Sequence, residues 1–153
     1  MSVMETIGQF LREEEVGFEQ DDELKVIRFL FSNEAAGWTV TIHYLEDAAQ
    51  IVVLSHLSST VAEEFRSVVA EFVLRANCDL LVGGFDFGLD DGLVRFRTAM
   101  DIDDLDVTTQ FVRNLIYSNV STMDLHITAL NRLAHGGANV AEAFQLLEAN
   151  LQD

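Results

Sequence analysis

A dense run of potential metal ligands lies at residues 101–106, where four of six residues are aspartates. Carboxylate oxygens are the ligands that Ca²⁺ prefers in proteins. An EF-hand loop counted from Asp101 needs glycine at its sixth position and glutamate at its twelfth. These positions hold Asp106 and Val112, so the pattern fails. We expect a solvated acidic linker, with a weak cation site as the alternative, because clustered carboxylates are common on acidic surfaces.

Other residues that could do chemistry lack the spacing that a catalytic, metal or phosphate site needs. Gly83 and Gly84 lead into a predicted strand, without a lysine and without the GxGxxG spacing of a phosphate loop. Cys78 follows a predicted helix, whereas reactive cysteines typically lie at helix N-termini, so we expect a packed or idle thiol. The histidines share no metal-binding spacing: His43, His56, His126 and His135. We therefore expect a protein that is not an enzyme and holds no cofactor or metal.

The charge balance indicates which partners the chain avoids. It carries 26 acidic and 9 basic residues, for a formal net charge of −17. Nucleic acid and anionic membranes carry the same sign of charge, so we expect neither as a partner. No apolar run approaches the roughly 18 residues of a membrane helix, and the acidic N-terminal stretch does not resemble a secretory signal. With a single cysteine the chain fits a reducing compartment, so we expect a cytoplasmic protein.

Hydrophobic periodicity predicts an α+β fold with an antiparallel sheet, in the order α-β-β-β-α-β-β-α, followed by an extra C-terminal helix. At 153 residues, we expect one domain over 1–153. The first helix begins with a capping box at Ser2 and Glu5 and ends at Gly17, and an acidic connection follows at 19–23. Alternating apolar residues predict strands at 26–31 and 38–44, and a fully apolar run predicts an internal strand at 51–54.

In the second half of the chain, a capping box at Thr60 and Glu63 predicts the start of a helix that ends near Asn77. Strands at 80–87 and 93–100 are joined across Asp91 and Gly92, a pair typical of a type I′ turn. A long helix over 108–134 has a polar pair in its middle, Ser118 and Asn119, that we interpret as a bend. Glycines at 136–137 end this helix, and Asn139 caps a last helix with three inward side chains: Phe144, Leu147 and Leu151.

The alternation in the strands also sorts side chains onto the two faces of the sheet. One set faces the helices: Ile27, Phe29, Trp38, Val40, Ile42, Val94 and Phe96. The opposite face then carries four basic side chains with three apolar neighbours: Arg28, His43, Arg95 and Arg97 with Val26, Leu30 and Leu93. Two interpretations stay open for this surface. The arginines lie along the sheet and pair with local carboxylates, or they form an interface for a second copy or an extended polypeptide.

Short motifs along the chain resemble a known family. They are Leu-Arg-Ala-Asn at 74–77, Gly-Phe at 84–85, the hairpin from Asp91 to Arg97, and the strand Trp38–Ile42. Over roughly Thr6 to Ala134 the chain resembles the YbjN-domain family of bacterial sensory transduction regulators. The element order is also similar to that of the Tir-chaperone-like type III secretion chaperones, which are small, acidic, cytoplasmic homodimers that hold an unfolded stretch of a secreted protein.

The resemblance implies a fold rather than an activity, and it implies no catalytic residues. We expect a non-enzymatic chaperone-like or regulatory adaptor that binds a polypeptide segment, as a homodimer, through Val26, Arg28, Leu30, His43, Leu93, Arg95 and Arg97. The alternative is a small-molecule or cation-binding sensory module. The chain departs from the chaperone plan after Ala134, where we expect an added helix that could cover a surface that the chaperones leave open.

Overall fold

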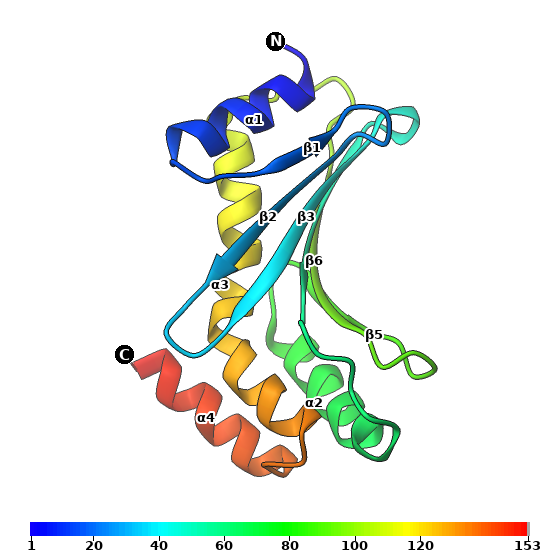
Figure 1. Cartoon of the computed structure of the whole chain (residues 1–153), viewed down its shortest axis with the longest axis vertical. Helices are drawn as coiled ribbons and strands as arrows, with labels where there is room; N and C mark the ends of the chain where they lie inside the picture. Colours follow the sequence, from blue (N-terminus) through cyan, green and yellow to red (C-terminus); the bar gives the residue numbers. More distant parts are fainter. Residues whose placement is uncertain (153) are drawn as a thin grey trace.

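A six-stranded antiparallel sheet with the strand order β1-β2-β3-β4-β6-β5 forms the centre of the fold, and a long helix crosses one of its faces (Figure 1). The structure is a computed structural model that describes residues 1–152. The strands are β1 (Glu19–Asp21), β2 (Val26–Ser32), β3 (Gly37–Leu45), β4 (Gln50–His56), β5 (Gly84–Phe87) and β6 (Val94–Asp101). The helices are α1 (Val3–Glu13), α2 (Arg66–Asp79), α3 (Thr109–Ala134) and α4 (Val140–Gln152), with short 3-10 turns at Glu46–Ala48 and Glu63–Phe65. This confirms the expected α+β class.

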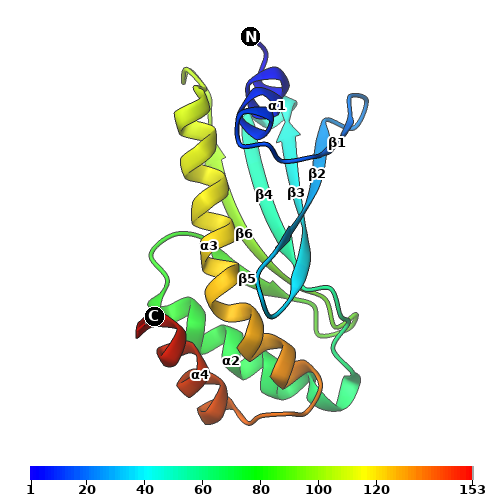
Figure 2. The ribbon, with the colours of Figure 1, turned by 60° about the vertical axis from the view of Figure 1, so that its left-hand side comes forward.

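The helices lie on the same side of the sheet. The long α3 packs on β4 and β6, α1 lies beside its N-terminal half, and α2 and α4 pack at its C-terminal half (Figure 2). Among the described residues, no helix covers the opposite face, which we call the outer face. The added C-terminal helix α4 packs on α2 and α3, so it leaves the outer face free.

Local capping explains where the first and last helices begin. The hydroxyl of Ser2 accepts from the Glu5 N–H at 3.2 Å, and the Glu5 carboxylate accepts from the Ser2 N–H at 2.7 Å, which confirms the predicted capping box. Asn139 caps α4 as expected, because its side-chain oxygen accepts from the N–H of Glu142 at 2.8 Å. The expectation that Leu151 of α4 faces inward is wrong, because its side chain is 63% exposed.

Several predicted boundaries in the first half of the chain are wrong. The helix α1 ends at Glu13 rather than at Gly17, because Glu15 takes a positive φ of 58° that breaks the helix. Residues 19–21 are not a simple connection, since they pair with β2 as the short strand β1. The predicted capping box at Thr60 is also wrong, because α2 begins only at Arg66.

The hairpin between β5 and β6 is longer than predicted. Its loop spans residues 88–93, and Gly92 has a positive φ of 72° while Asp91 does not, so the turn is not type I′. Arg66 at the start of α2 donates to the carbonyls of Leu89 and Asp90 at 3.2 and 2.9 Å. This contact holds the loop in its wider form. The strand β5 begins only at Gly84, so the prediction of a strand over 80–83 is wrong.

The polar pair in the middle of α3 ties the helix to the sheet. Asn119 is fully buried, and its amide donates to the carbonyls of Val53 and Phe96 at 2.9 and 3.0 Å. Its oxygen accepts from the Ser55 hydroxyl at 2.6 Å, and that hydroxyl accepts from the Trp38 indole at 3.0 Å. Asn119 therefore forms a satisfied buried polar network that sets how α3 lies on the sheet.

Candidate partner-binding surface

The inward and outward sides of the strands are those that the alternation predicts. All seven residues expected to face the helices are buried: Ile27, Phe29, Trp38, Val40, Ile42, Val94 and Phe96. The register brings the predicted outward residues into rows across the sheet. Val26 lies opposite His43, and the next row runs across β2, β3, β4 and β6 through Arg28, Thr41, Leu54 and Arg97. Leu93 precedes β6 at the hairpin and is exposed.

The outer face is apolar and basic at its surface. Thr41 and Leu54 at its centre are themselves buried, so the accessible surface is formed by the longer side chains around them. Of these, Leu30 is 78% and Leu93 53% exposed. Three of the nine basic residues of the chain lie on this face although the net charge is −17. A surface of arginines and apolar side chains has the composition of a protein interface.

The arginines on the outer face differ in their local partners. Arg97 makes two hydrogen bonds of 3.0 Å to the carboxylate of Asp86 on β5, and Arg95 makes one of 3.2 Å to the same carboxylate. Local pairing, one of the two predicted interpretations, therefore holds for these two. Arg28 makes no ion pair within residues 1–152. A guanidinium has five N–H donors, so all three arginines keep donors for a partner.

A pair of histidines shares one hydroxyl at the centre of the outer face. The Nε2 atoms of His43 and His56 lie 3.0 and 2.9 Å from Oγ1 of Thr41. The hydroxyl has one proton, so when both rings are neutral it donates to one ring and accepts from the other. Burial, and secondarily the nearby charge of Arg95, lowers the pKa of both histidines. Sequence reasoning missed His56 because the third strand was predicted to end at Leu54, two residues before it.

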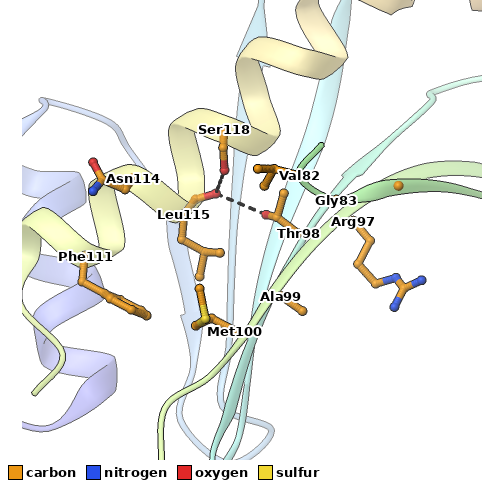
Figure 3. Close-up of a pocket in the computed structure, with 11 residues that line it drawn as sticks. Val82, Gly83, Arg97, Thr98, Ala99, Met100, Phe111, Asn114, Leu115 and Ser118 are labelled. Atoms are coloured by element: carbon orange, nitrogen blue, oxygen red, sulfur yellow. Dashed lines mark hydrogen bonds between the residues drawn. The ribbon is translucent and has the colours of Figure 1, made fainter. Parts of the chain in front are cut away.

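A second feature, a cavity of about 570 Å³, lies between β6 and α3 (Figure 3). Its apolar wall comes from the side chains of Val82, Met100, Phe111 and Leu115. The hydroxyls of Thr98 and Ser118 both donate to the Leu115 carbonyl, at 3.2 and 3.0 Å, so these polar groups are satisfied within the wall. Sequence reasoning missed the cavity because it extended β5 back to Leu80, which would have filled this space.

The other candidates for chemistry remain apart from one another. Within residues 1–152, no group of three or more histidine, cysteine, aspartate or glutamate side chains gathers to hold a metal ion. The ring of His126 packs between Phe72 and Phe85, with Nδ1 donating to the Thr122 carbonyl at 2.7 Å. Cys78 is exposed rather than packed. None of the described helices has the length and apolar character that crossing a bilayer requires.

Comparison with known proteins agrees with this architecture. A family model described as "YbjN: Putative bacterial sensory transduction regulator" matches residues 4–132. The crystal structure of YbjN from E. coli is similar with a TM-score of 0.64 and 14% identity, over 88% of this chain and 94% of that one. No curated protein matches the chain.

Two solved complexes are also similar in fold. A chain of the HopA1–SchA chaperone–effector complex matches with a TM-score of 0.53 and 10% identity, over 78% of this chain and 88% of that one. A chain of the ExsC–ExsE complex matches with a TM-score of 0.58 and 14% identity, over 84% and 92%. At these identities the likeness shows the fold alone, and the fold is that of the secretion-chaperone-like group expected from the element order.

Proposed function

Because this chain belongs to the YbjN family, whose model spans most of its length, we propose that it is a non-enzymatic, chaperone-like or regulatory adaptor. It binds an extended segment of another polypeptide on its sheet, and it works as a homodimer in the cytoplasm. The observation that carries this proposal is the outer face, which the helices leave uncovered and which presents arginines among apolar side chains. The fold likeness to a chain of a chaperone–effector complex supports a protein as the partner.

The outer face offers two kinds of contact to an extended segment. Leu30 and Leu93 are exposed and provide apolar contact area. The free donors of Arg28, Arg95 and Arg97 bind carboxylates or backbone carbonyls of the partner. Arginine suits such an interface because its guanidinium is weakly hydrated and presents several donors in one plane. The same surface serves the homodimer if the partner is a second copy.

The test is purification of the tagged protein from its own host under mild conditions, with mass spectrometry of what binds to it. Arg28→Glu is the informative variant, because Arg28 is exposed and has no ion pair that the change would break within residues 1–152. Reversing Arg95 or Arg97 is less informative, since it also places a carboxylate against Asp86 and loosens β5 from β6. The control is Arg75→Glu on α2, which makes the same change in net charge at another exposed site.

We expect a stoichiometric polypeptide partner with the wild type and with Arg75→Glu, and a loss of about tenfold or more with Arg28→Glu. Circular dichroism and a thermal scan show whether each variant is folded. If the partner binds equally to both variants, it does not bind on the outer face. If the wild type carries no polypeptide, the adaptor function is wrong.

The cavity beside β6 favours a second candidate, a small-molecule sensory module. Its volume of about 570 Å³ lies within the range of ligand sites, which is roughly 300–1,000 Å³. Native mass spectrometry of the protein from its own host tests this candidate directly. A bound small molecule that is lost on Leu115→Arg would support it, and a protein without added mass would count against it.

A further inference from the structure

We propose that the free edge of β6 and the cavity beside it form a docking site for one extended segment of a partner polypeptide. The free edge is defined as residues Ala99–Asp101. The segment adds a strand to the sheet there, places an apolar side chain in the cavity, and sets a basic side chain against the acidic loop, residues 101–106. This inference rests on the proposed function, because it names the surface and the chemistry of the polypeptide that the adaptor binds.

The strand β6 is longer than its edge partner. β4 pairs with β6 from Arg95 to Asp101, whereas β5 pairs with it only from Val94 to Arg97. The bond from the Ile102 N–H to the Ala49 carbonyl (2.8 Å), together with strand alternation, directs the backbone groups of Ala99 and Asp101 away from β4. No strand within residues 1–152 pairs with β6 on that side beyond Arg97. The free edge therefore presents unpaired N–H and C=O groups, which are a template for another strand.

A glycine holds this edge open. Gly83, just before β5, has a positive φ of 74°, which turns the preceding chain away from β6. A Cβ on Gly83 would lie 2.5 Å from the Arg97 carbonyl oxygen and 2.9 Å from Cγ2 of Thr98, so only glycine fits this close approach. As a result the pairing of β5 with β6 stops at Arg97, where the free edge begins. In the segment before β5, Leu81 and Val82 are exposed, and Val82 lines the cavity.

The cavity lies where the side chains of an added strand would point. Thr98 and Met100 are on the helix side of β6, opposite to Ala99 (Figure 3). Gly83 occupies the position next to Thr98, so the residue of the added strand opposite Met100 is the one that projects toward Phe111 and Leu115 of α3. Because the wall is mainly apolar and the hydroxyls of Thr98 and Ser118 already donate to the Leu115 carbonyl, the cavity favours an apolar side chain at this position.

The acidic loop selects the charge of the segment. Its four aspartates, Asp101, Asp103, Asp104 and Asp106, are exposed and make no ion pair within residues 1–152. A Lys or Arg on the residue opposite Asp101 would meet this loop, whereas a carboxylate there would be repelled. The segment that fits best therefore has an apolar residue opposite Met100 and a basic residue opposite Asp101.

The direct test is fluorescence anisotropy with a short fluorescein-labelled peptide in which isoleucine and threonine alternate and which ends in lysines. The informative variant is Ala99→Pro, since proline removes an edge N–H that points away from β4 and leaves the β4–β6 ladder intact. The matched control is Ala99→Thr, which keeps the N–H and suits a strand. We expect Ala99→Pro to weaken binding about tenfold and Ala99→Thr to leave it within about twofold. Equal binding by the two variants would overturn the proposal, as would no binding by the wild type.

A second measurement tests the charge preference. The same peptide ending in glutamates should bind the wild type about tenfold more weakly, and this preference should become smaller in the double variant Asp103→Asn, Asp104→Asn, which removes two of the four charges. Asparagine suits position 104, where the backbone has a positive φ of 58°. An unchanged preference in the double variant would contradict the role given to the acidic loop.

If a second copy of the chain or a small molecule occupied the free edge instead, the same variants would give different results. A dimer that dissociates in Ala99→Pro but not in Ala99→Thr would show that a second copy fills the site, and a small molecule held in the cavity that displaces the peptide would show a ligand site. Either result overturns this proposal. Host partner capture separates the two proposals: capture by Ala99→Pro that is lost in Arg28→Glu would leave the adaptor function standing and remove only the docking site.

Discussion

The buried asparagine of α3 provides a direct test of how the helix is held on the sheet. Asn119→Ala removes the amide that donates to the carbonyls of Val53 and Phe96 and the oxygen that accepts from Ser55. The two carbonyls belong to paired strands, β4 and β6, so they keep their ladder partners. The hydroxyl of Ser55, which is also fully buried, is the group that loses its acceptor.

The free-energy cost follows from these contacts. A buried donor left without an acceptor costs about 1–3 kcal/mol, and each of the two lost amide bonds contributes about 0.5–1 kcal/mol net. The free energy of unfolding should therefore fall by about 2–5 kcal/mol. The matched control is Asn114→Ala on the same helix. Asn114 is exposed and its side-chain bond is to Gln110 only, so this change should stay within about 0.5 kcal/mol.

The assay is urea unfolding of both variants and the wild type, followed by circular dichroism. An unchanged m-value together with a lower midpoint shows that stability alone has changed. If Asn119→Ala loses no more stability than Asn114→Ala, the polar network does not hold α3 on the sheet and the argument is wrong.

Two further predictions concern the core and the edge. Burial lowers the pKa of His126 in the folded chain below its ordinary value of 6.5, so the unfolded chain binds more protons as the pH falls below that value. The free energy of unfolding should therefore be at its full value near pH 7.5 and fall toward pH 5. Urea unfolding should show a smaller fall over this pH range in His126→Gln than in the wild type. An equal fall in both proteins would contradict a buried neutral ring. Gly83→Ala should cost about 1–3 kcal/mol, because it combines a positive φ with a clash on Arg97, whereas Gly137→Ala, where a Cβ meets only ordinary contacts, should cost less. A thermal scan that ranks the two glycine variants equally would refute the role given to Gly83.

The faces of the central strands were predictable because one side of the sheet is buried. A shift of one residue in β2 or β3 would turn Ile27, Phe29 and Trp38 to solvent, so the apolar alternation determines which side chains face outward. The short strand β1 was not predictable by the same argument. Its three residues are all polar and exposed, and they form a strand only because β2 offers an edge to pair with.

The turn and the helix cap that were predicted wrongly depend on contacts between residues that are far apart in the sequence. Asp91 and Gly92 alone favour a two-residue turn, but Arg66 binds the carbonyls of Leu89 and Asp90 and widens the loop. The N–H of Val61, expected in a first helical turn, donates instead to the carbonyl of Gly92 at 2.9 Å. Local propensity is a weak prior wherever an arginine or a strand from another part of the chain supplies a different hydrogen bond.

The outer face and the free edge meet at one residue, which relates the two proposals to each other. Arg97 belongs to the outer face and also lines the cavity beside the free edge. A long segment that crosses the outer face from Arg28 can therefore continue into the free edge and end at the acidic loop. On this basis Arg28→Glu should weaken capture of a full-length partner yet leave the short lysine-ended peptide unaffected, whereas Ala99→Pro should weaken both. Equal effects of Arg28→Glu on the partner and on the short peptide would show that the two surfaces are not used in sequence by one segment.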